Sequence, residues 1–64
     1  MSLGNSLFQA RKKSGLSQER VSAHLGVSRQ TISKWECDET LPDITQAKRL
    51  ASLYHTSLDD LIDF

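Results

Sequence analysis

A chain of 64 residues has room for one domain with a small core, since a domain of this size buries only about 60% of the surface of its unfolded chain. Its single cysteine, Cys37, excludes an internal disulfide and a multi-cysteine zinc site, and fits a reducing cytosol. No apolar run approaches the roughly 18 residues that cross a bilayer, and no signal peptide pattern begins the chain. We therefore expect a cytoplasmic protein with no membrane partner.

The formal net charge is zero, but the charges are unevenly distributed. Residues 1–34 hold six basic residues and one acidic residue, whereas residues 35–64 hold two basic and seven acidic residues, which gives net charges of +5 and −5. A basic half is typical of a nucleic-acid-binding protein, and we expect the acidic half to face away from phosphate. Such asymmetry also arises by chance in small domains, so it supports a binding motif but does not replace one.

The first predicted helix covers residues 3–14. Its inner face consists of three residues at helical spacing, Leu3, Leu7 and Ala10. Basic residues occupy its last turn, where cations favour the negative end of the helix dipole, and Gly15 stops it. Phe8 lies off the inner face, and two interpretations stay open: packing against the C-terminal helices, which we favour, or an exposed contact for a partner. Residues 1–3 are assigned no function.

Residues 16–36 predict two short helices joined by a tight turn. Two apolar stripes follow helical spacing, the first made of Leu16, Val21 and Leu25 and the second of Val27, Ile32 and Trp35. Gly26 lies between the stripes and can take the left-handed conformation that ends a helix. Ser17 and Ser28 each precede a helical run, where a hydroxyl can accept a bond from a free helix N–H. These features together indicate a helix-turn-helix.

The polar face of the second of these helices has the chemistry of DNA recognition. It carries no acidic residue before Glu36, and its members are Ser28, Arg29, Gln30, Thr31, Ser33 and Lys34. Arginine can bond O6 and N7 of guanine, glutamine can bond N6 and N7 of adenine, and a hydroxyl residue can touch a thymine methyl or a phosphate. The alternative is an ordinary solvated helix face. The adjoining turn and first helix favour major-groove reading.

Residues 25–36, LGVSRQTISKWE, resemble the helix-turn-helix of the Cro and phage-repressor-like family of bacterial transcription regulators, the xenobiotic-response-element class. That family's pattern is LGVSRxTISxWE, preceded by leucine, Ser or Thr, Gln and Glu, as in residues 16–19 here. The resemblance extends from about Leu3 to Ile62. It implies a lambda-repressor-like all-α fold and sequence-specific binding of double-stranded DNA by a recognition helix over residues 28–35, as in a repressor.

The resemblance also implies roles for single residues. Gln18, at the start of the scaffold helix, would contact a phosphate, and Arg11 would form a structural ion pair with Glu36. Gly26 and Trp35 would be structural. The candidates for base readout are Ser28, Arg29, Gln30 and Lys34, and the hydroxyl-bearing candidates for phosphate contacts are Thr31 and Ser33.

Two positions depart from the family pattern. Ser22 stands where the family usually has alanine at a close helix approach, and the small size is kept. Asp38 stands where the family usually has glycine, two residues after the Trp-Glu pair. Aspartate tolerates the left-handed conformation better than most residues, so the turn can still form. The carboxylates of Asp38 and Glu39 argue against a phosphate contact from this loop.

The C-terminal half predicts two more helices and no strand. Asp43 with Gln46 resembles a capping box for a helix over residues 44–54. The inner residues of that helix are Ile44, Ala47, Leu50, Ala51 and Tyr54. Ser57 can cap a last short helix, whose inward residues are Leu58, Leu61 and Ile62. The sequence therefore predicts an all-α, compact bundle of five short helices.

Catalysis finds no support in the sequence, so we expect no enzyme, no cofactor and no metal site. The chain has no Gly-rich phosphate loop, and its candidate ligands or nucleophiles are scattered, namely His24, His55 and Cys37. The alternative function is a protein-interaction or antitoxin-like module on the same fold. That alternative requires three exposed aromatic residues, Phe8, Tyr54 and Phe64.

We expect residues 1–64 to form a single DNA-binding domain that acts as a homodimer, because one short helix reads only a few base pairs and two half-sites about 34–36 Å apart would supply the rest. No dimer surface is evident, and Phe8 with the C-terminal residues is a weak candidate. A linker and an effector or oligomerisation domain after Phe64 stay an open possibility, as partners of this domain.

Overall fold

The computed structural model describes residues 2–62, and it confirms the predicted all-α fold. Its helices are α1 (Leu3–Ser14), α2 (Gln18–Leu25), α3 (Arg29–Glu36), α4 (Ile44–Leu53) and α5 (Leu58–Ile62). Tyr54, expected as the last residue of the fourth helix, instead follows α4 as its C-cap. No strand occurs between residues 2 and 62, and none of the helices there has the length and apolarity to span a bilayer.

The helices begin and end where local side chains satisfy the backbone. Before each of α1 to α4 stands a residue whose side-chain oxygen accepts a hydrogen bond from the N–H three residues later: Ser2, Ser17, Ser28 and Asp43. Ser57 caps α5 in the same way, through the N–H of Asp60. Gly15 and Gly26 end α1 and α2 in the left-handed conformation, with φ of 76° and 71°. The predicted caps and stops are confirmed.

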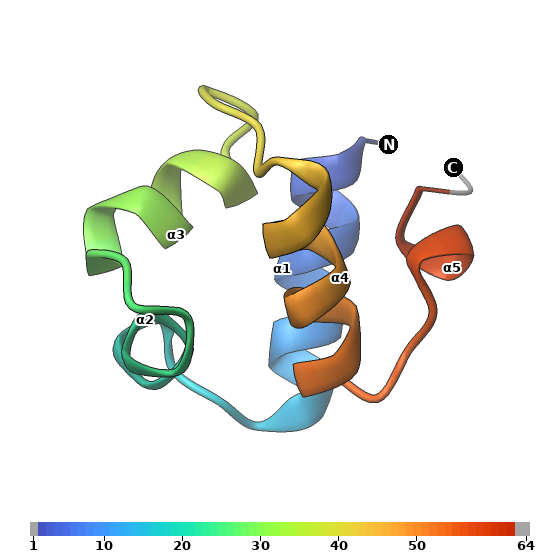
Figure 1. The fold of residues 1–64 in the computed structure, drawn as a ribbon, viewed down its shortest axis with the longest axis horizontal. Helices are drawn as coiled ribbons and strands as arrows, with labels where there is room; N and C mark the ends of the chain where they lie inside the picture. Colours follow the sequence, from blue (N-terminus) through green and yellow to red (C-terminus); the bar gives the residue numbers. More distant parts are fainter. Residues whose placement is uncertain (1, 63–64) are drawn as a thin grey trace.

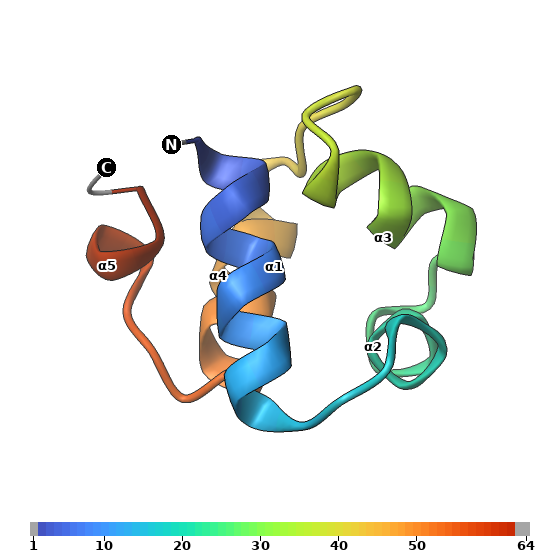
Figure 2. The same cartoon turned by 180° about the vertical axis from the view of Figure 1, so that it is seen from behind.

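The helix-turn-helix occupies one end of the molecule and α5 the other. Figures 1 and 2 show α2 and α3 on one side, α5 on the opposite side, and α1 and α4 between them. α3 packs against both α1 and α2, and α5 packs against α1 and α4. The core that joins them consists of Leu7, Val21, Leu25, Ile32, Trp35, Leu50, Ala51, Tyr54 and Leu61. Both predicted stripes of the motif thus contribute to one core.

Three predicted packing residues are exposed instead. Ile44 is 66% exposed and Ile62 is 51% exposed, so the expectation that both face inward is wrong. Each lies at an end of its helix, where no other helix of residues 2–62 covers it. Phe8, favoured as a residue packing on the C-terminal helices, is 38% exposed and lies outside the core. It follows Gly4 by one helical turn, on the edge of α1 nearer α3, and its ring lies 5.5 Å from the guanidinium of Arg11.

The N-terminus of α1 is held by the turn that follows α3. Asp38 takes the left-handed conformation with φ of 61°, as expected for the residue that replaces glycine. Its carboxylate accepts hydrogen bonds from the Ser2 hydroxyl at 2.5 Å and the Gly4 N–H at 2.9 Å. These bonds hold the pKa of Asp38 below its usual range. Ser2 and Leu3, to which no function was assigned, thus have a structural role, because Ser2 caps α1 and Leu3 is its first residue.

Candidate nucleic-acid interface

α3 has one buried side and one exposed side. Ile32 and Trp35 anchor the helix in the core. On the helical wheel, positions 30, 33 and 34 share the side opposite these two anchors, and position 29 lies at its edge. The exposed residues of the predicted DNA-binding face are Ser28, Arg29, Gln30 and Lys34, whereas Thr31 and Ser33 are partly buried. α3 lies at the edge of the molecule, so this side faces solvent (Figure 1).

The turn between α2 and α3 is closed by backbone hydrogen bonds. The N–H groups of Gly26 and Val27 both donate to the C=O of Ser22, at 2.9 and 3.1 Å. Ser22 is buried, and its hydroxyl donates to the C=O of Glu19 at 2.7 Å, so the small polar residue is satisfied within its own helix. This turn sets the angle at which α3 leaves α2.

Gly26→Ala is expected to lower the free energy of unfolding by about 1–2 kcal/mol, because Gly26 is left-handed and a Cβ in that conformation costs roughly this amount. An added Cβ would meet no atom within 4 Å, so the cost is conformational and does not arise from a clash. Urea unfolding followed by circular dichroism measures the difference. Gly26→Asn serves as the control and should lose less, since asparagine tolerates this conformation. Equal losses in both variants would contradict this explanation.

A chain of hydrogen bonds links α1 and α2 to both ends of α3. Arg11 donates from Nε and Nη2 to the two oxygens of Glu36, at 2.7 and 3.2 Å. Gln18 donates from Nε2 to Oε1 of Glu36 at 3.0 Å. Arg29 in turn donates from Nη1 to Oε1 of Gln18 at 3.1 Å. We name these four residues the polar chain. The structure thus brings Arg11 and Glu36 together, as the resemblance implied.

The sequence did not indicate the two contacts of Gln18. Its side chain was expected to point at a phosphate, but it bridges Glu36, 18 residues later, and Arg29, 11 residues later. No local pattern shows such a link, since it depends on how α2 and α3 cross. Gln18 still lies at the N-terminus of α2, where free N–H groups and the positive end of the helix dipole favour an anion. The expected phosphate contact stays a prediction.

The hydroxyl groups at the start of α3 serve the helix itself. Oγ of Ser28 accepts from the N–H of Thr31 at 3.2 Å and lies 3.0 Å from Oγ1 of Thr31. Gln30 and Lys34 form no side-chain hydrogen bond or ion pair among residues 2–62. The groups on this surface that are available to bind a ligand are therefore the side chains of Gln30 and Lys34 and the N–H donors of Arg29 that do not bond Gln18.

The acidic residues of the C-terminal half do not all lie far from α3. Asp59 and Asp60 belong to α5, at the opposite end of the molecule (Figures 1 and 2). The turn after α3, however, carries Asp38 and Glu39 next to its C-terminus. The acidic residues of α5 thus lie away from α3, those of this turn lie next to it, and the expectation that the acidic half faces away from phosphate stays a prediction. The Asp38 carboxylate is directed to the N-terminus of α1.

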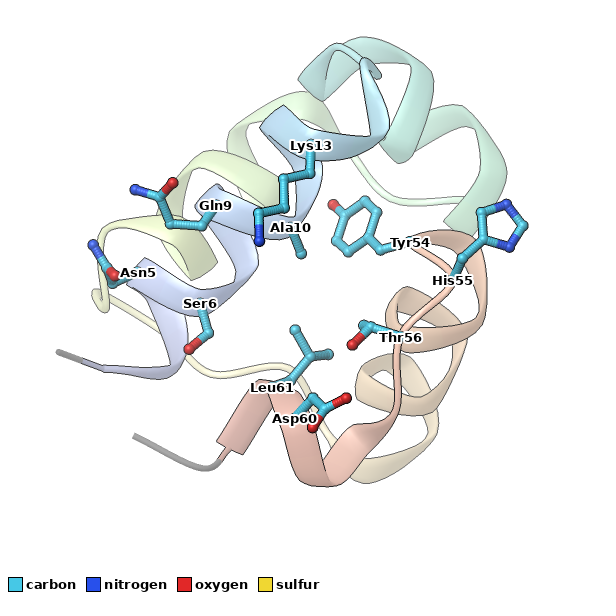
Figure 3. Close-up of a pocket in the computed structure, with 10 residues that line it drawn as sticks. All are labelled: Asn5, Ser6, Gln9, Ala10, Lys13, Tyr54, His55, Thr56, Asp60 and Leu61. Atoms are coloured by element: carbon cyan, nitrogen blue, oxygen red, sulfur yellow. The ribbon is translucent and has the colours of Figure 1, made fainter.

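A groove of about 480 Å³ lies on the other side of α1, between that helix and the segment from Tyr54 to Leu61. Figure 3 shows Gln9 and Lys13 on its α1 wall, while the imidazole of His55 points away from it. The groove does not include any residue of α3. Within residues 2–62, no three His, Cys, Asp or Glu side chains lie close enough together to hold a metal ion. Tyr54, which the interaction alternative requires at the surface, is 7% exposed, and Phe64 lies outside the described residues.

Residues 7–61 match the sequence profile of the family described as Helix-turn-helix. The chain belongs to this family. It is 36% identical over 62 residues to the HTH-type transcriptional regulator ImmR of Bacillus subtilis (strain 168), with 97% of this chain and 49% of that protein covered. It is 32% identical over 62 residues to the HTH-type transcriptional activator BcrR of Enterococcus faecalis, with 97% and 30% covered. The helix-turn-helix chain thus spans half or less of the length of these two relatives.

Solved structures resemble the whole helix-turn-helix domain. The P22 c2 repressor protein, in complex with synthetic operator 9T, superposes with a TM-score of 0.89 at 31% identity, covering 97% of this chain and 94% of that one. A transcriptional regulator from Listeria innocua superposes with a TM-score of 0.88 at 30% identity, covering 98% and 59%. The fold and the placement of the helix-turn-helix are therefore those of known transcription regulators.

Proposed function

We propose that the chain is the DNA-binding domain of a bacterial transcription regulator, a repressor, and that α3 binds the major groove of double-stranded DNA sequence-specifically. The observation that carries the proposal is the exposed side of α3, which carries Arg29, Gln30 and Lys34 and no acidic residue of the helix. The likeness to a repressor in complex with its operator supports this role. The domain binds in the cytoplasm and does not catalyse a reaction.

Each side chain of the surface has a distinct proposed role. Arg29 and Gln30 read base edges, since an arginine bonds guanine and a glutamine bonds adenine through paired donors and acceptors. Ser28 and Lys34, at the two ends of this surface, meet bases or backbone. Gln18, Thr31 and Ser33 contact phosphates, which fix the register of the helix and carry no sequence information. Gly26, Trp35 and the pair of Arg11 with Glu36 hold this geometry.

Arg29→Ala is expected to weaken binding to the preferred site by about 1–3 kcal/mol and to relax preference at one or two base pairs. Selection of bound sites from random duplex DNA with the purified domain supplies the site and the preference at each base pair. Gln30→Ala should relax a different base pair. The matched control is Lys13→Ala, which removes a cation from the opposite side of α1. An Arg29→Ala protein that selects the wild-type motif would rule out the assigned role.

The regulator is proposed to act as a homodimer on two half-sites. A single α3 of eight residues reads few base pairs, so two copies about 34–36 Å apart would supply the remaining specificity. The relatives extend well beyond the length of this domain, which leaves room in such proteins for an effector or oligomerisation region. A selected motif with two inverted halves would support the dimer, and a single short half-site would speak against it.

A further inference from the structure

The amide of Gln18 lies between two groups of opposite character. Its Nε2 donates to Glu36 and its Oε1 accepts from Arg29. A carboxylate has only acceptors and a guanidinium has only donors, so one orientation of the amide satisfies both neighbours. The reversed amide would place oxygen against oxygen at Glu36 and N–H against N–H at Arg29. The carboxylate therefore fixes which end of the amide faces Arg29.

Glu36 is itself firmly placed. Both of its oxygens accept from Arg11, and the third nitrogen of that guanidinium, Nη1, donates to the C=O of Leu16 at 3.0 Å. The paired geometry fixes the plane of the carboxylate as well as its position. The Glu36 side chain is 4% exposed, so solvent hardly competes for these bonds. The orientation of Gln18 thus depends on a rigid contact between α1 and α3.

We propose that Glu36 is a positioning residue for sequence specificity, which acts through Gln18 on the guanidinium of Arg29. This inference rests on the proposed function and deepens it. With Oε1 of Gln18 facing Arg29, one donor of Arg29 is held and the others remain free for a base. An exposed arginine without this acceptor has to lose more rotamer freedom when it binds. The identity of residue 36 therefore determines how well Arg29 reads its base pair.

The proposal predicts that the direction of the hydrogen bond between residues 18 and 36 can be reversed while Arg29 keeps its acceptor. In Glu36→Gln, the new amide no longer requires an N–H from Gln18, so the oxygen that holds Arg29 is no longer fixed. In the double variant Gln18→Glu/Glu36→Gln, the amide at position 36 can accept from Arg11 and donate to the carboxylate at position 18, which accepts from Arg29. The double variant keeps the net charge of the polar chain and the acceptor of Arg29, reverses the bond between positions 18 and 36, and retains one of the two bonds that Arg11 makes to residue 36.

The test compares base preference in sites selected from random duplex DNA. Glu36→Gln should lose about tenfold in preference at the base pair that Arg29→Ala also relaxes, a change within the range that one bidentate side chain provides. The preference at the other base pairs should stay unchanged. The double variant should regain most of the lost preference. Leu61→Val, a core change in α5 at the far end of the molecule, is the control for a loss of stability alone and should keep the full motif.

Gln18→Met covers the case in which Glu36→Gln does not fold. It leaves the ion pair of Arg11 with Glu36 intact but removes the acceptor of Arg29, so it should relax the same base pair. It should also weaken binding to all sequences alike if Gln18 contacts a phosphate. Retained preference in Gln18→Met, or in a folded Glu36→Gln, would overturn the role of Glu36, as would a folded double variant without rescue. A wild-type domain that selects no motif would instead refute the proposed function itself.

Discussion

Glu36→Ala is expected to lower the free energy of unfolding by about 3–5 kcal/mol, the usual cost of breaking a buried ion pair by removing one partner. The side chains of Arg11 and Glu36 are 11% and 4% exposed, and their closest atoms lie 2.7 Å apart. The variant leaves the guanidinium of Arg11 desolvated without a countercharge. It also removes the carboxylate that accepts the hydrogen bond from Nε2 of Gln18. Because a domain of this size has only roughly 3–10 kcal/mol in total, we expect a large unfolded fraction at room temperature.

Urea unfolding followed by helical circular dichroism measures this loss. Glu39→Ala removes an exposed carboxylate three residues away and should change stability by no more than about 0.5 kcal/mol. The double variant Arg11→Met/Glu36→Leu should recover much of the loss, since packed apolar residues often replace a buried pair at little cost. An exposed ion pair contributes no more than about 1 kcal/mol to the free energy of unfolding. A loss below this value in Glu36→Ala would therefore contradict the burial of the pair of Arg11 with Glu36.

The features predicted correctly from the sequence are those that depend on neighbours within one turn. Ser17 and Ser28 accept bonds from N–H groups three residues away, and Gly26 ends α2 through its own backbone conformation. Such effects are decided by residue type and spacing, so they can be derived without the tertiary structure. The apolar stripes of α2 and α3 were also correct, because a helix between neighbours on several sides buries most of its apolar face.

The predictions failed where an element of the tertiary structure decides the outcome. Periodicity gave Ile44 and Ile62 an inward face, but it does not show whether another element lies there to cover them. The contacts of Asp38 with Gly4 and of Gln18 with Glu36 join residues 34 and 18 positions apart. The departure of Asp38 from the family glycine was a usable signal, yet it did not reveal that its carboxylate caps another helix. In the candidate site, the residue types could be predicted and their mutual bonds could not.

Gly4→Ala is expected to destabilise the domain by about 3 kcal/mol, at the upper end of the usual cost of overpacking. A Cβ on Gly4 would lie 2.7 Å from three atoms, namely the backbone oxygens of Trp35 and Glu36 and Oδ1 of Asp38. The carboxylate can move, but the two carbonyls belong to the last turn of α3 and cannot. The substitution therefore has to push α1 away from α3. This clash must outweigh the gain of about 1 kcal/mol that alanine provides over glycine in a helix interior.

The sign of the stability change in Gly4→Ala shows whether the clash of the new Cβ or the helix propensity of alanine is larger. Helix propensity alone would raise the unfolding midpoint, and the clash lowers it. Gly4→Ala/Asp38→Gly removes the one mobile atom of the three and should recover little, because both carbonyls remain in place. Asn5→Ala, an exposed change at the next position, controls for a general response of α1. A more stable Gly4→Ala protein would show that α1 and α3 do not approach this closely in solution. Close packing here also holds Glu36 beside Arg11, so the folded fraction of Gly4→Ala should lose preference at the base pair that Arg29 reads.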